Sequence, residues 1–320
     1  MLTTHVMVRV FAVGVLVLGA TGAAGQNYPN RLIRIVSSGV GGPADFGARL
    51  VATGLTGVLG QQVIVDNRRG SVEIASRLVA VAPPDGYTLI FRGSTFWIFP
   101  LLQKTNYDPL VDFSPISLVT RQPSVVVVHP SVPVKTIREL IALAKARPGA
   151  LNYGTPELGS VSHLATELLK SMAGVDIVGI AYNSTQGALL DLFSGQIQLM
   201  ITTTSAVIPH MKTGKLRGLA VTSAQPSQFA PGLPTVAESG LPGYEAELRQ
   251  GIFAPAQTPA AIISQLNEAI ARVVENPDVK QKFLSSGVEP AASTPAELTN
   301  TIKSDMARME KVVKAAGLRH

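Results

Sequence analysis

The sequence predicts an α/β protein of two domains, each built on a mostly parallel sheet flanked by helices. Three observations support this fold class. Short runs rich in β-branched residues alternate with amphipathic stretches along most of the chain, as in repeated strand–helix–strand units. A length of 320 residues suffices for two domains. A hydrophobic content of 46% with only 15% charged residues excludes intrinsic disorder.

The first 25 residues have the layout of a secretory signal peptide. Arg9 supplies the positive charge, Val10 to Leu18 form a short apolar run, and Ala23-Ala24-Gly25 provide the small side chains of a signal peptidase site. The run is shorter than the ~20 residues that span a bilayer, although a membrane anchor is the alternative. We therefore expect residues 1–25 to be removed and the mature protein to act outside the cytoplasm.

The first part of the mature chain alternates regularly between strand and helix. Strands are predicted at 32–37, 62–66 and 88–92, and helices at 45–59 and 71–80. Two further strands are predicted at 114–120 and 125–129. The second of these is apolar throughout, which is typical of a strand that is buried on both faces of a sheet.

The alternation continues in the second part. A capping box of Thr136 and Glu139 opens a predicted helix at 136–147. Strands follow at 151–153, 178–182, 199–203 and 219–223, with helices at 160–173 and 187–194. Residues 224–243 are rich in Pro, Gly and Ser and predict a long loop. The C-terminal part is predicted to be helical, with starts at Thr258-Pro259 and Thr294-Pro295 and an end at Gly317.

The C-terminal helices have few strands left to cover, so we expect them to return to the first domain. Domain 1 would then comprise residues 26–126 plus 252–320, and domain 2 residues 127–251. Two segments near 124–130 and 246–254 would connect the domains. Ligands of such sheets bind beyond the carboxyl ends of the strands, here in a cleft between the domains.

A glycine-rich turn after the first strand matches a dinucleotide-binding pattern. Gly39-Val40-Gly41-Gly42-Pro43-Ala44 fits G-x-G-x-x-G/A, and Asp66 ends the next strand. Pro43 removes one backbone donor, and export takes the chain away from soluble NAD. An exported α/β enzyme that uses a dinucleotide at Gly39–Ala44 is therefore the alternative function. Free N–H groups in such a turn also suit a carboxylate.

Other chemistry is excluded or weakly indicated. The chain has no cysteine, no pair of histidines at i, i+4 and no G-x-S-x-G nucleophile motif, so we expect no catalytic residue, metal or cofactor. A formal net charge of +6 and 5% aromatic residues favour a small anion over a nucleic acid.

The whole mature chain resembles the Bug-type extracytoplasmic solute receptors of tripartite tricarboxylate transporters. The resemblance rests on several motifs in order: Tyr28-Pro29-Asn30-Arg31, Leu59-Gly60-Gln61-Gln62, Asp66-Asn67-Arg68, Pro84-Asp85-Gly86-Tyr87, Leu151-Asn152-Tyr153-Gly154 and Pro234-Thr235-Val236-Ala237-Glu238-Ser239-Gly240. It implies a periplasmic-binding-protein (type II, Venus flytrap) fold, a small carboxylate ligand and no catalysis. It also implies membrane permease subunits as partners, and we expect a monomer that binds no nucleic acid.

The sequence departs from the family pattern at positions expected to face the cleft. The first turn reads Ser37-Ser38-Gly39-Val40-Gly41-Gly42, Glu73 stands where glycine is usual, and Gln198 replaces an aspartate. Trp97 and Arg249 are also unusual at their positions. The departures leave the fold intact and put the ligand in question.

Two half-sites are predicted to bind the anion. In domain 1 the backbone of Ser38, Gly39, Val40, Gly41 and Gly42 would hold one carboxylate, helped by Ser94 and Thr95. Asp45 is expected to cap the following helix without touching the anion. The domain 2 half-site would comprise Thr155, Gly159, Ser160, Tyr182, Asn183 and Thr203. The alternative for Ser160 is that it only caps its helix.

Trp97 and Arg249 are predicted to adapt the site to a particular ligand. The indole of Trp97 would form a flat apolar wall that favours an aromatic or larger carboxylate, and Arg249 would clamp a carboxylate with two hydrogen bonds. The alternative is that Trp97 packs under its own loop and Arg249 points to solvent.

Overall fold

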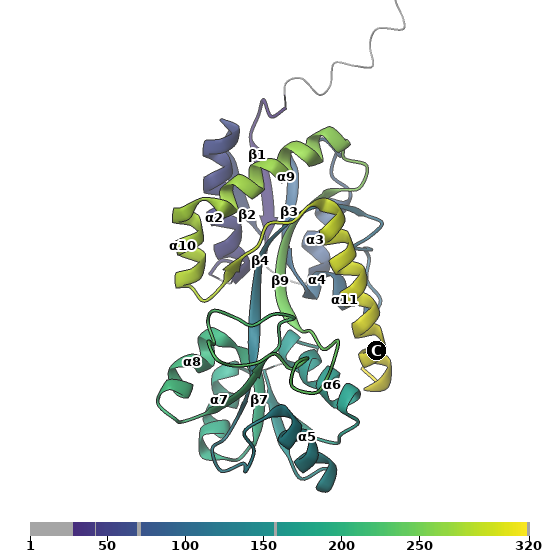
Figure 1. The fold of residues 1–320 in the computed structure, drawn as a ribbon. Helices are drawn as coiled ribbons and strands as arrows, with labels where there is room; N and C mark the ends of the chain where they lie inside the picture. Colours follow the sequence, from purple (N-terminus) through teal and green to yellow (C-terminus); the bar gives the residue numbers. More distant parts are fainter. Residues whose placement is uncertain (1–27, 42, 69–71, 157–158, 319–320) are drawn as a thin grey trace, which may run out of the picture.

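Two lobes joined by a pair of long strands make up the molecule (Figure 1). The computed structural model describes residues 28–41, 43–68, 72–156 and 159–318. The expected signal peptide and Gly42 of the predicted site lie outside the described residues.

The first lobe contains three parallel strands in the order β2-β1-β3. These are β1 (Ile33–Ser37), β2 (Val63–Asn67) and β3 (Thr88–Gly93), connected by α2 (Pro43–Leu59) and α3 (Val72–Ala80). Side chains alternate across the sheet: Ile33 and Ile35 pack with α2 and α9 (Ala260–Glu275), whereas Val36 packs with α3 on the other face. The predicted strands and helices of this part are confirmed.

The second lobe repeats the pattern with β5 (Asn152–Thr155), β6 (Val178–Ala181) and β7 (Leu199–Thr203), in which β5 pairs parallel with both neighbours. Its other elements are β8 (Arg217–Val221), α5 (Ile137–Ala146), α6 (Val161–Ala173), α7 (Thr185–Ser194) and α8 (Thr204–Lys212). The predicted loop at 224–243 contains no helix or strand. The carboxyl ends of the parallel strands in both lobes therefore carry the turns that were predicted to bind a ligand.

The two connecting strands are β4 (Phe113–Val128) and β9 (Glu247–Pro255). The prediction of two separate strands at 114–120 and 125–129 is wrong, because β4 runs unbroken for 16 residues. Its first part pairs antiparallel with β9, and from Ser124 onward it pairs antiparallel with β7 in the second sheet. Extended backbone thus passes from one lobe to the other without an intervening loop.

Several helices were not predicted or begin differently. The short helix α4 (Thr95–Leu102) contains Pro100, and α8 contains Pro209, so both lack the usual sequence pattern of a helix. Thr258 does not cap α9; its hydroxyl donates to the Pro255 carbonyl, and Pro259 occupies the cap position. The C-terminal elements are completed by α10 (Pro277–Ser285), β10 (Glu289–Pro290) and α11 (Pro295–Ala315).

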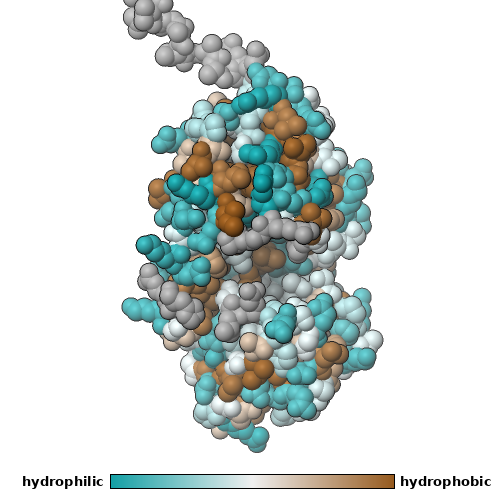
Figure 2. Space-filling view, turned by 180° about the vertical axis from the view of Figure 1, so that it is seen from behind, coloured by the Kyte–Doolittle hydropathy of each residue, from teal (hydrophilic) through white to brown (hydrophobic). Residues whose placement is uncertain are grey.

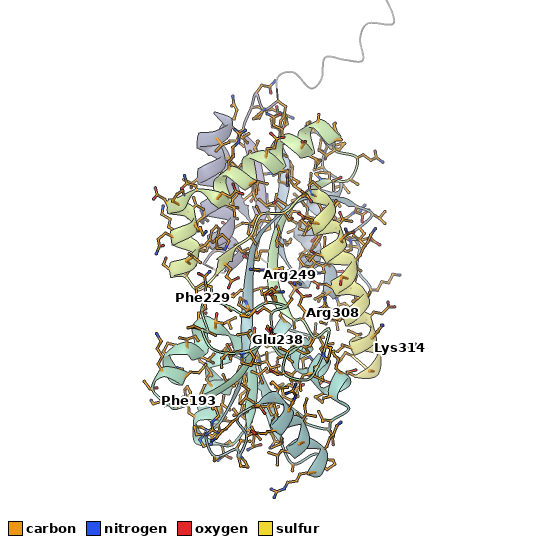
Figure 3. The ribbon with its side chains drawn as sticks, viewed as in Figure 1. Phe193, Phe229, Glu238, Arg249, Arg308 and Lys314 are labelled. Atoms are coloured by element: carbon orange, nitrogen blue, oxygen red, sulfur yellow. The ribbon has the colours of Figure 1, made fainter. Side chains whose placement is uncertain are left out.

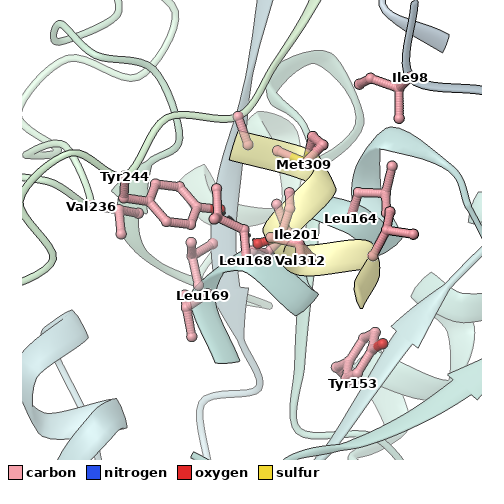
Figure 4. Packing of buried hydrophobic residues seen from close by; sticks show 14 of the residues in the cluster. Ile98, Tyr153, Leu164, Leu168, Leu169, Ile201, Val236, Tyr244, Met309 and Val312 are labelled. Carbon is pink, nitrogen blue, oxygen red and sulfur yellow. Dashed lines mark hydrogen bonds between the residues drawn. The ribbon is translucent and has the colours of Figure 1, made fainter. Parts of the chain in front are cut away.

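The last helix contacts both lobes. It begins with the predicted capping box, in which Thr294 and Glu297 exchange hydrogen bonds, and it packs against α4 of the first lobe. Its C-terminal half contacts α6 of the second lobe (Figure 1). There Met309 and Val312 join a buried cluster with Leu164 and Leu168 of α6 (Figure 4). The helix α11 therefore packs on both lobes, whereas α9 and α10 pack on the first.

A buried group of charges ties β9 to α11 at the junction (Figure 3). Arg249 of β9 forms ion pairs with Asp305 of α11 at 3.0 Å, with Glu247 at 3.0 Å and with Glu245. Arg308 of α11 contacts Glu245 at 3.1 Å. Burial would lower the pKa of Arg249, but the three carboxylates raise it above its ordinary value. The guanidinium is therefore a fully charged, fully paired part of the interior.

The surface seen in Figure 2 mixes hydrophilic and hydrophobic side chains over both lobes. Exposed apolar residues such as Ile74, Val81 and Leu190 lie on different elements. Among the described residues no helix is both long and apolar enough to cross a bilayer. On that face hydrophobic and hydrophilic side chains are interspersed, which directs attention to the junction between the lobes.

We predict that Arg249→Met lowers the free energy of unfolding by about 3–5 kcal/mol, because it leaves Glu247 and Asp305 buried without their cation. Arg31→Met is the matched control, since Arg31 pairs with Asp85 at the surface and its loss costs about 0–1 kcal/mol. Urea unfolding followed by circular dichroism measures both. Equal stability of the two variants would contradict the structural role of Arg249.

Candidate functional site

A cavity of about 430 Å³ lies between the lobes. Its wall combines residues of the first lobe, the connecting strands and the second lobe: Gly41, Phe46, Gln122, Thr203, Ser205, Gln250, Phe283, Ser286 and Val288. A volume of this order suits a small organic ligand. Of the predicted residues, Gly41 and Thr203 lie on this wall from opposite lobes.

Asp45 and Asn67 hold the turn between β1 and α2. Asp45 Oδ2 accepts a hydrogen bond of 2.9 Å from the Gly41 amide, and its Oδ1 accepts one of 2.7 Å from Asn67 Nδ2. The same amide nitrogen of Asn67 donates to the Ser38 carbonyl at 2.7 Å. Arg49 adds an ion pair with Asp45 at 2.9 Å. The expectation that Gly41 offers its N–H to an anion is therefore wrong in this conformation, because a carboxylate of the chain already accepts it.

The electrostatics of Asp45 follow from these contacts. Burial of the carboxyl raises its pKa, but the hydrogen bonds from Gly41, Arg49 and Asn67 outweigh that effect and hold the pKa below its ordinary value. Asp45 is thus ionised at neutral pH, and its carboxylate stabilises the turn between β1 and α2. The prediction that Asp45 caps the helix is not met, because Asp45 lies inside the first turn of α2 and accepts from the Gly41 amide before the helix. Val40, at the tip of the turn, is well exposed.

Ser94 does not face the cleft. It is only 1% exposed, and its hydroxyl accepts a hydrogen bond of 2.9 Å from the Arg249 amide of β9. The prediction that Ser94 helps to bind the anion is therefore wrong in this structure, since the residue fastens the end of β3 to β9. Thr95 is exposed at the start of α4, where it lines a small hollow together with Gly159 of the other lobe.

The turn before α6 is held in the same way as the turn before α2. The Gly159 amide donates to His163 Nδ1 at 2.9 Å, and Ser160 Oγ accepts from the His163 amide at 3.2 Å. Thr155 is buried, with its hydroxyl 3.3 Å from that of Ser160. Ser160 therefore caps its helix, which was the stated alternative. The prediction that the Gly159 N–H binds an anion is wrong in this conformation, because His163 already accepts that N–H.

The remaining residues of the second half-site lie at the ends of two strands, β6 and β7. Tyr182, after β6, donates its hydroxyl to Asp191 at 2.7 Å, and Asn183 next to it is exposed. Thr203 ends β7, with its hydroxyl 3.3 Å from that of Ser205 on the cavity wall. Thr203 thus reaches the cavity directly, whereas Tyr182 is fixed by its own lobe.

Trp97 and Arg249 are buried, and the prediction that they shape the ligand site is wrong. Trp97 is 0% exposed and donates its indole N–H to Asp305 at 3.3 Å. Arg249 is 7% exposed and engaged by the carboxylates described above. The alternative, in which Trp97 packs under its own loop and Arg249 points to solvent, is wrong as well, because Trp97 lies in α4 and packs against Phe253 of β9. The argument for an aromatic ligand accordingly loses its basis.

The sequence reasoning missed the two glutamines on the connecting strands. Gln122 and Gln250 line the cavity, and Gln250 Oε1 accepts a hydrogen bond of 3.0 Å from Thr120. The glutamine side chains on the connecting segments are the signal that was available, because the floor of an inter-lobe cleft must lie on those segments. Within the described ranges no group of acidic and histidine side chains is placed to hold a metal ion.

Comparisons with known proteins give a consistent picture. Residues 47–318 match the family model described as "Tripartite tricarboxylate transporter family receptor". The chain is 34% identical to Protein BugT of Bordetella pertussis over 320 residues, which covers 97% of this chain and 98% of that protein.

Solved structures are similar over nearly the whole chain as well. "R. palustris Rpa4515 with adipate" is 37% identical with a TM-score of 0.71, covering 91% of this chain and 98% of that one. MatC from Rhodopseudomonas palustris with bound malate is 29% identical with a TM-score of 0.68, covering 89% and 100%. The α/β periplasmic-binding-protein fold that was expected is thereby confirmed.

We predict that Gly41→Val weakens binding of a small ligand in the cavity at least about tenfold while the protein still folds. The backbone of Gly41 has φ +87°, which strains a β-branched residue, whereas an added Cβ meets no atom within 4 Å. The turn therefore has to change shape beside the cavity. Isothermal titration calorimetry measures the affinity.

Gly60→Val is the matched control for this variant. Gly60 has φ +66° and equally open surroundings, but it lies at the far end of α2. It carries the same kind of strain away from the cavity, so its affinity should equal that of the wild type. Unchanged affinity in Gly41→Val would remove the turn from the binding site.

We predict that Asp45→Asn destabilises the protein at neutral pH and that the difference from wild type disappears in acid. The folded-state pKa of Asp45 is lowered, so its contribution is present above the ordinary carboxyl pKa of ~4 and is lost as the pH falls through the lowered value. Unfolding free energies of both proteins from pH 7 down to about pH 3 test this. A difference that stays constant over this range would show that the charge of Asp45 is not involved.

Proposed function

The chain belongs to the tripartite tricarboxylate transporter receptor family, whose members are periplasmic binding proteins and not enzymes, and from this premise we propose that it binds a small aliphatic dicarboxylate between its lobes. The bound anion would then be delivered to membrane permease subunits of a tripartite tricarboxylate-type transporter. Removal of residues 1–25 on export would place the receptor, as a monomer, in the periplasm.

The inter-lobe cavity is the observation that carries this proposal. Gly41 from the first lobe and Thr203 with Ser205 from the second face the same space, so one small molecule can contact both lobes. A ligand that touches both lobes favours the closed arrangement through those contacts. The proposed division into domain 1 (26–126 plus 252–320) and domain 2 (127–251) puts the cavity at their boundary.

The chemistry of the wall favours a short, flexible acid. Serine, threonine and glutamine side chains supply hydrogen bonds, and Phe46 and Phe283 supply apolar contact for a carbon chain. The relatives with bound adipate and malate carry aliphatic diacids. With Trp97 in the core, the indole wall that was predicted to favour an aromatic ring is absent, and the dinucleotide enzyme finds no support in a family of receptors.

We predict that adipate or malate raises the melting temperature of the purified protein. A ligand present at 100 times its dissociation constant adds about 2.7 kcal/mol to the free energy of unfolding. A thermal-shift series should include adipate, malate and NAD at matched ionic strength. Stabilisation by NAD together with no response to any dicarboxylate would overturn the proposal.

Variants at the two ends of α8 provide the control. Thr203→Val removes a hydroxyl from the cavity wall and should reduce the thermal shift, whereas Thr213→Val changes an exposed threonine at the far end of α8 and should leave it unchanged. An equal effect of the two substitutions would point to a loss of stability of α8 and away from ligand contact.

A further inference from the structure

Gln250 is a buried amide on the wall of the inter-lobe cavity. It lies on β9, is 6% exposed, and pairs in register with Gly93 of β3 on one side and Thr120 of β4 on the other. Residues that pair directly across neighbouring strands present their side chains on the same face of a sheet, so Thr120 and Gln250 lie side by side. That face borders the cavity, because Gln250 lines it.

The two ends of this amide have different surroundings. Oε1 accepts a hydrogen bond of 3.0 Å from the Thr120 hydroxyl, and Gly47 of α2 lies against it, since a Cβ atom added there would be 3.4 Å from this oxygen. Nε2 forms no hydrogen bond with any part of the chain that the structure describes, and it is not one of the fully enclosed atoms that lack a partner. The nitrogen therefore opens to the cavity with two free N–H donors.

Gln198 shows how the fold satisfies a glutamine amide that has a structural role alone. Its Oε1 accepts a hydrogen bond of 2.9 Å from the Asn152 amide, and its Nε2 donates one of 3.0 Å to the Gly195 carbonyl. The backbone of the second lobe thus uses both ends of that side chain. Gln250 is more than nine-tenths buried, yet its donor end is left over. A buried donor without a partner on a cavity wall is suited to a ligand atom that accepts hydrogen bonds.

The charges around the cavity decide which ligand group this donor suits. Among the described residues that line it, none is acidic and none is basic. Asp45, four residues after Gly41, is already paired with Arg49. An ammonium group would find no counter-charge on this wall, and burying one without a partner is costly. A carboxylate instead finds the N–H donors of Gln250 and the rotatable hydroxyls of the second lobe.

On the proposed function, we infer that Gln250 binds one carboxylate of the ligand and makes the site selective for diacids over ω-amino acids of similar length. Its Nε2 donates to a carboxylate oxygen, which is a stronger acceptor than a neutral one. Thr120 is the positioning residue, because its hydroxyl donates to the amide oxygen and leaves the nitrogen end for the ligand.

The test compares adipate with ε-aminocaproate, in which an ammonium group replaces one carboxylate on a chain of similar length. Isothermal titration calorimetry on the wild type, Gln250→Met and Gln250→Glu gives the affinities. We expect the wild type to prefer adipate, and Gln250→Met to bind adipate roughly 10- to 100-fold more weakly because it lacks the donor. Equal adipate affinity in the wild type and Gln250→Met, or a preference of the wild type for ε-aminocaproate, would overturn the inference.

Gln250→Glu is the sharper variant, because loss of stability cannot imitate its effect. A glutamate still offers an acceptor to the Thr120 hydroxyl, but a carboxylate oxygen replaces the free donor. The variant should therefore reverse the preference, so that ε-aminocaproate binds more tightly than adipate. An unchanged preference would overturn the inference.

Thr120→Val tests the orientation of the amide. Without the hydroxyl, either end of the Gln250 amide can face the ligand, so the ratio of the adipate to the ε-aminocaproate affinity should fall. A residue that only supported the fold would weaken binding of both ligands alike. A ratio equal to that of the wild type would contradict the positioning role of Thr120.

Gln198→Met is the matched control for Gln250→Met. The same substitution is made just before β7, whereas the cavity lies at the other end of that strand, at Thr203. It should lower the urea midpoint, because Asn152 and Gly195 lose their partner, and leave the adipate affinity unchanged. An equal loss of affinity in both variants would trace the effect to stability and overturn the inference. Failure of the wild type to bind any diacid would instead overturn the proposed function, and this inference with it.

Discussion

The buried guanidinium of Arg249 is the contact on which the arrangement of the two lobes depends. It lies on β9, where the chain returns to the first lobe, and it binds Asp305 of α11. Asp305 also accepts the indole N–H of Trp97 on α4, so one carboxylate joins three elements. In the same helix, contacts with α4 and β4 of the first lobe are combined with apolar packing on α6 of the second lobe. A polar network inside the core therefore sets the geometry in which the cavity forms.

Much of the fold follows from local sequence patterns. The parts that do not depend on contacts between residues far apart in the sequence. The strands and helices of both lobes could be predicted from their periodicity, since each buries one face locally. The unbroken strand β4 and the helix α4 could not be predicted, because Pro123 and Pro100 disfavour strand and helix by their own propensity. Pairing with β9 and packing against α11 override that propensity. The placement of Trp97 failed for a related reason: its partner Asp305 is 208 positions away in the sequence.

The candidate site was predictable in position and misjudged in detail. The strand ends at Gly41 and Thr203 do meet at one cavity, as the parallel arrangement requires. The backbone amides of Gly41 and Gly159 were predicted to bind an anion. They instead donate hydrogen bonds to Asp45 and His163. In both turns the acceptor is four residues after the glycine, so both lobes use the same device to shape a turn before a helix. An acceptor at that spacing is a signal that the sequence contained.

The unbroken backbone of β4 gives the junction a mechanical character. A loop hinge turns freely about a few bonds, whereas a strand paired on both sides changes direction only through small increments of twist along its length. The bulges where β4 shifts register against β9 and β8, near Ser117, Thr120 and Val127, are the points at which such twist is easiest. Relative rotation of the lobes then meets a restoring torque that grows with the angle. Twisting of β4 would thus store elastic energy when the lobes close, and would return part of it when they separate.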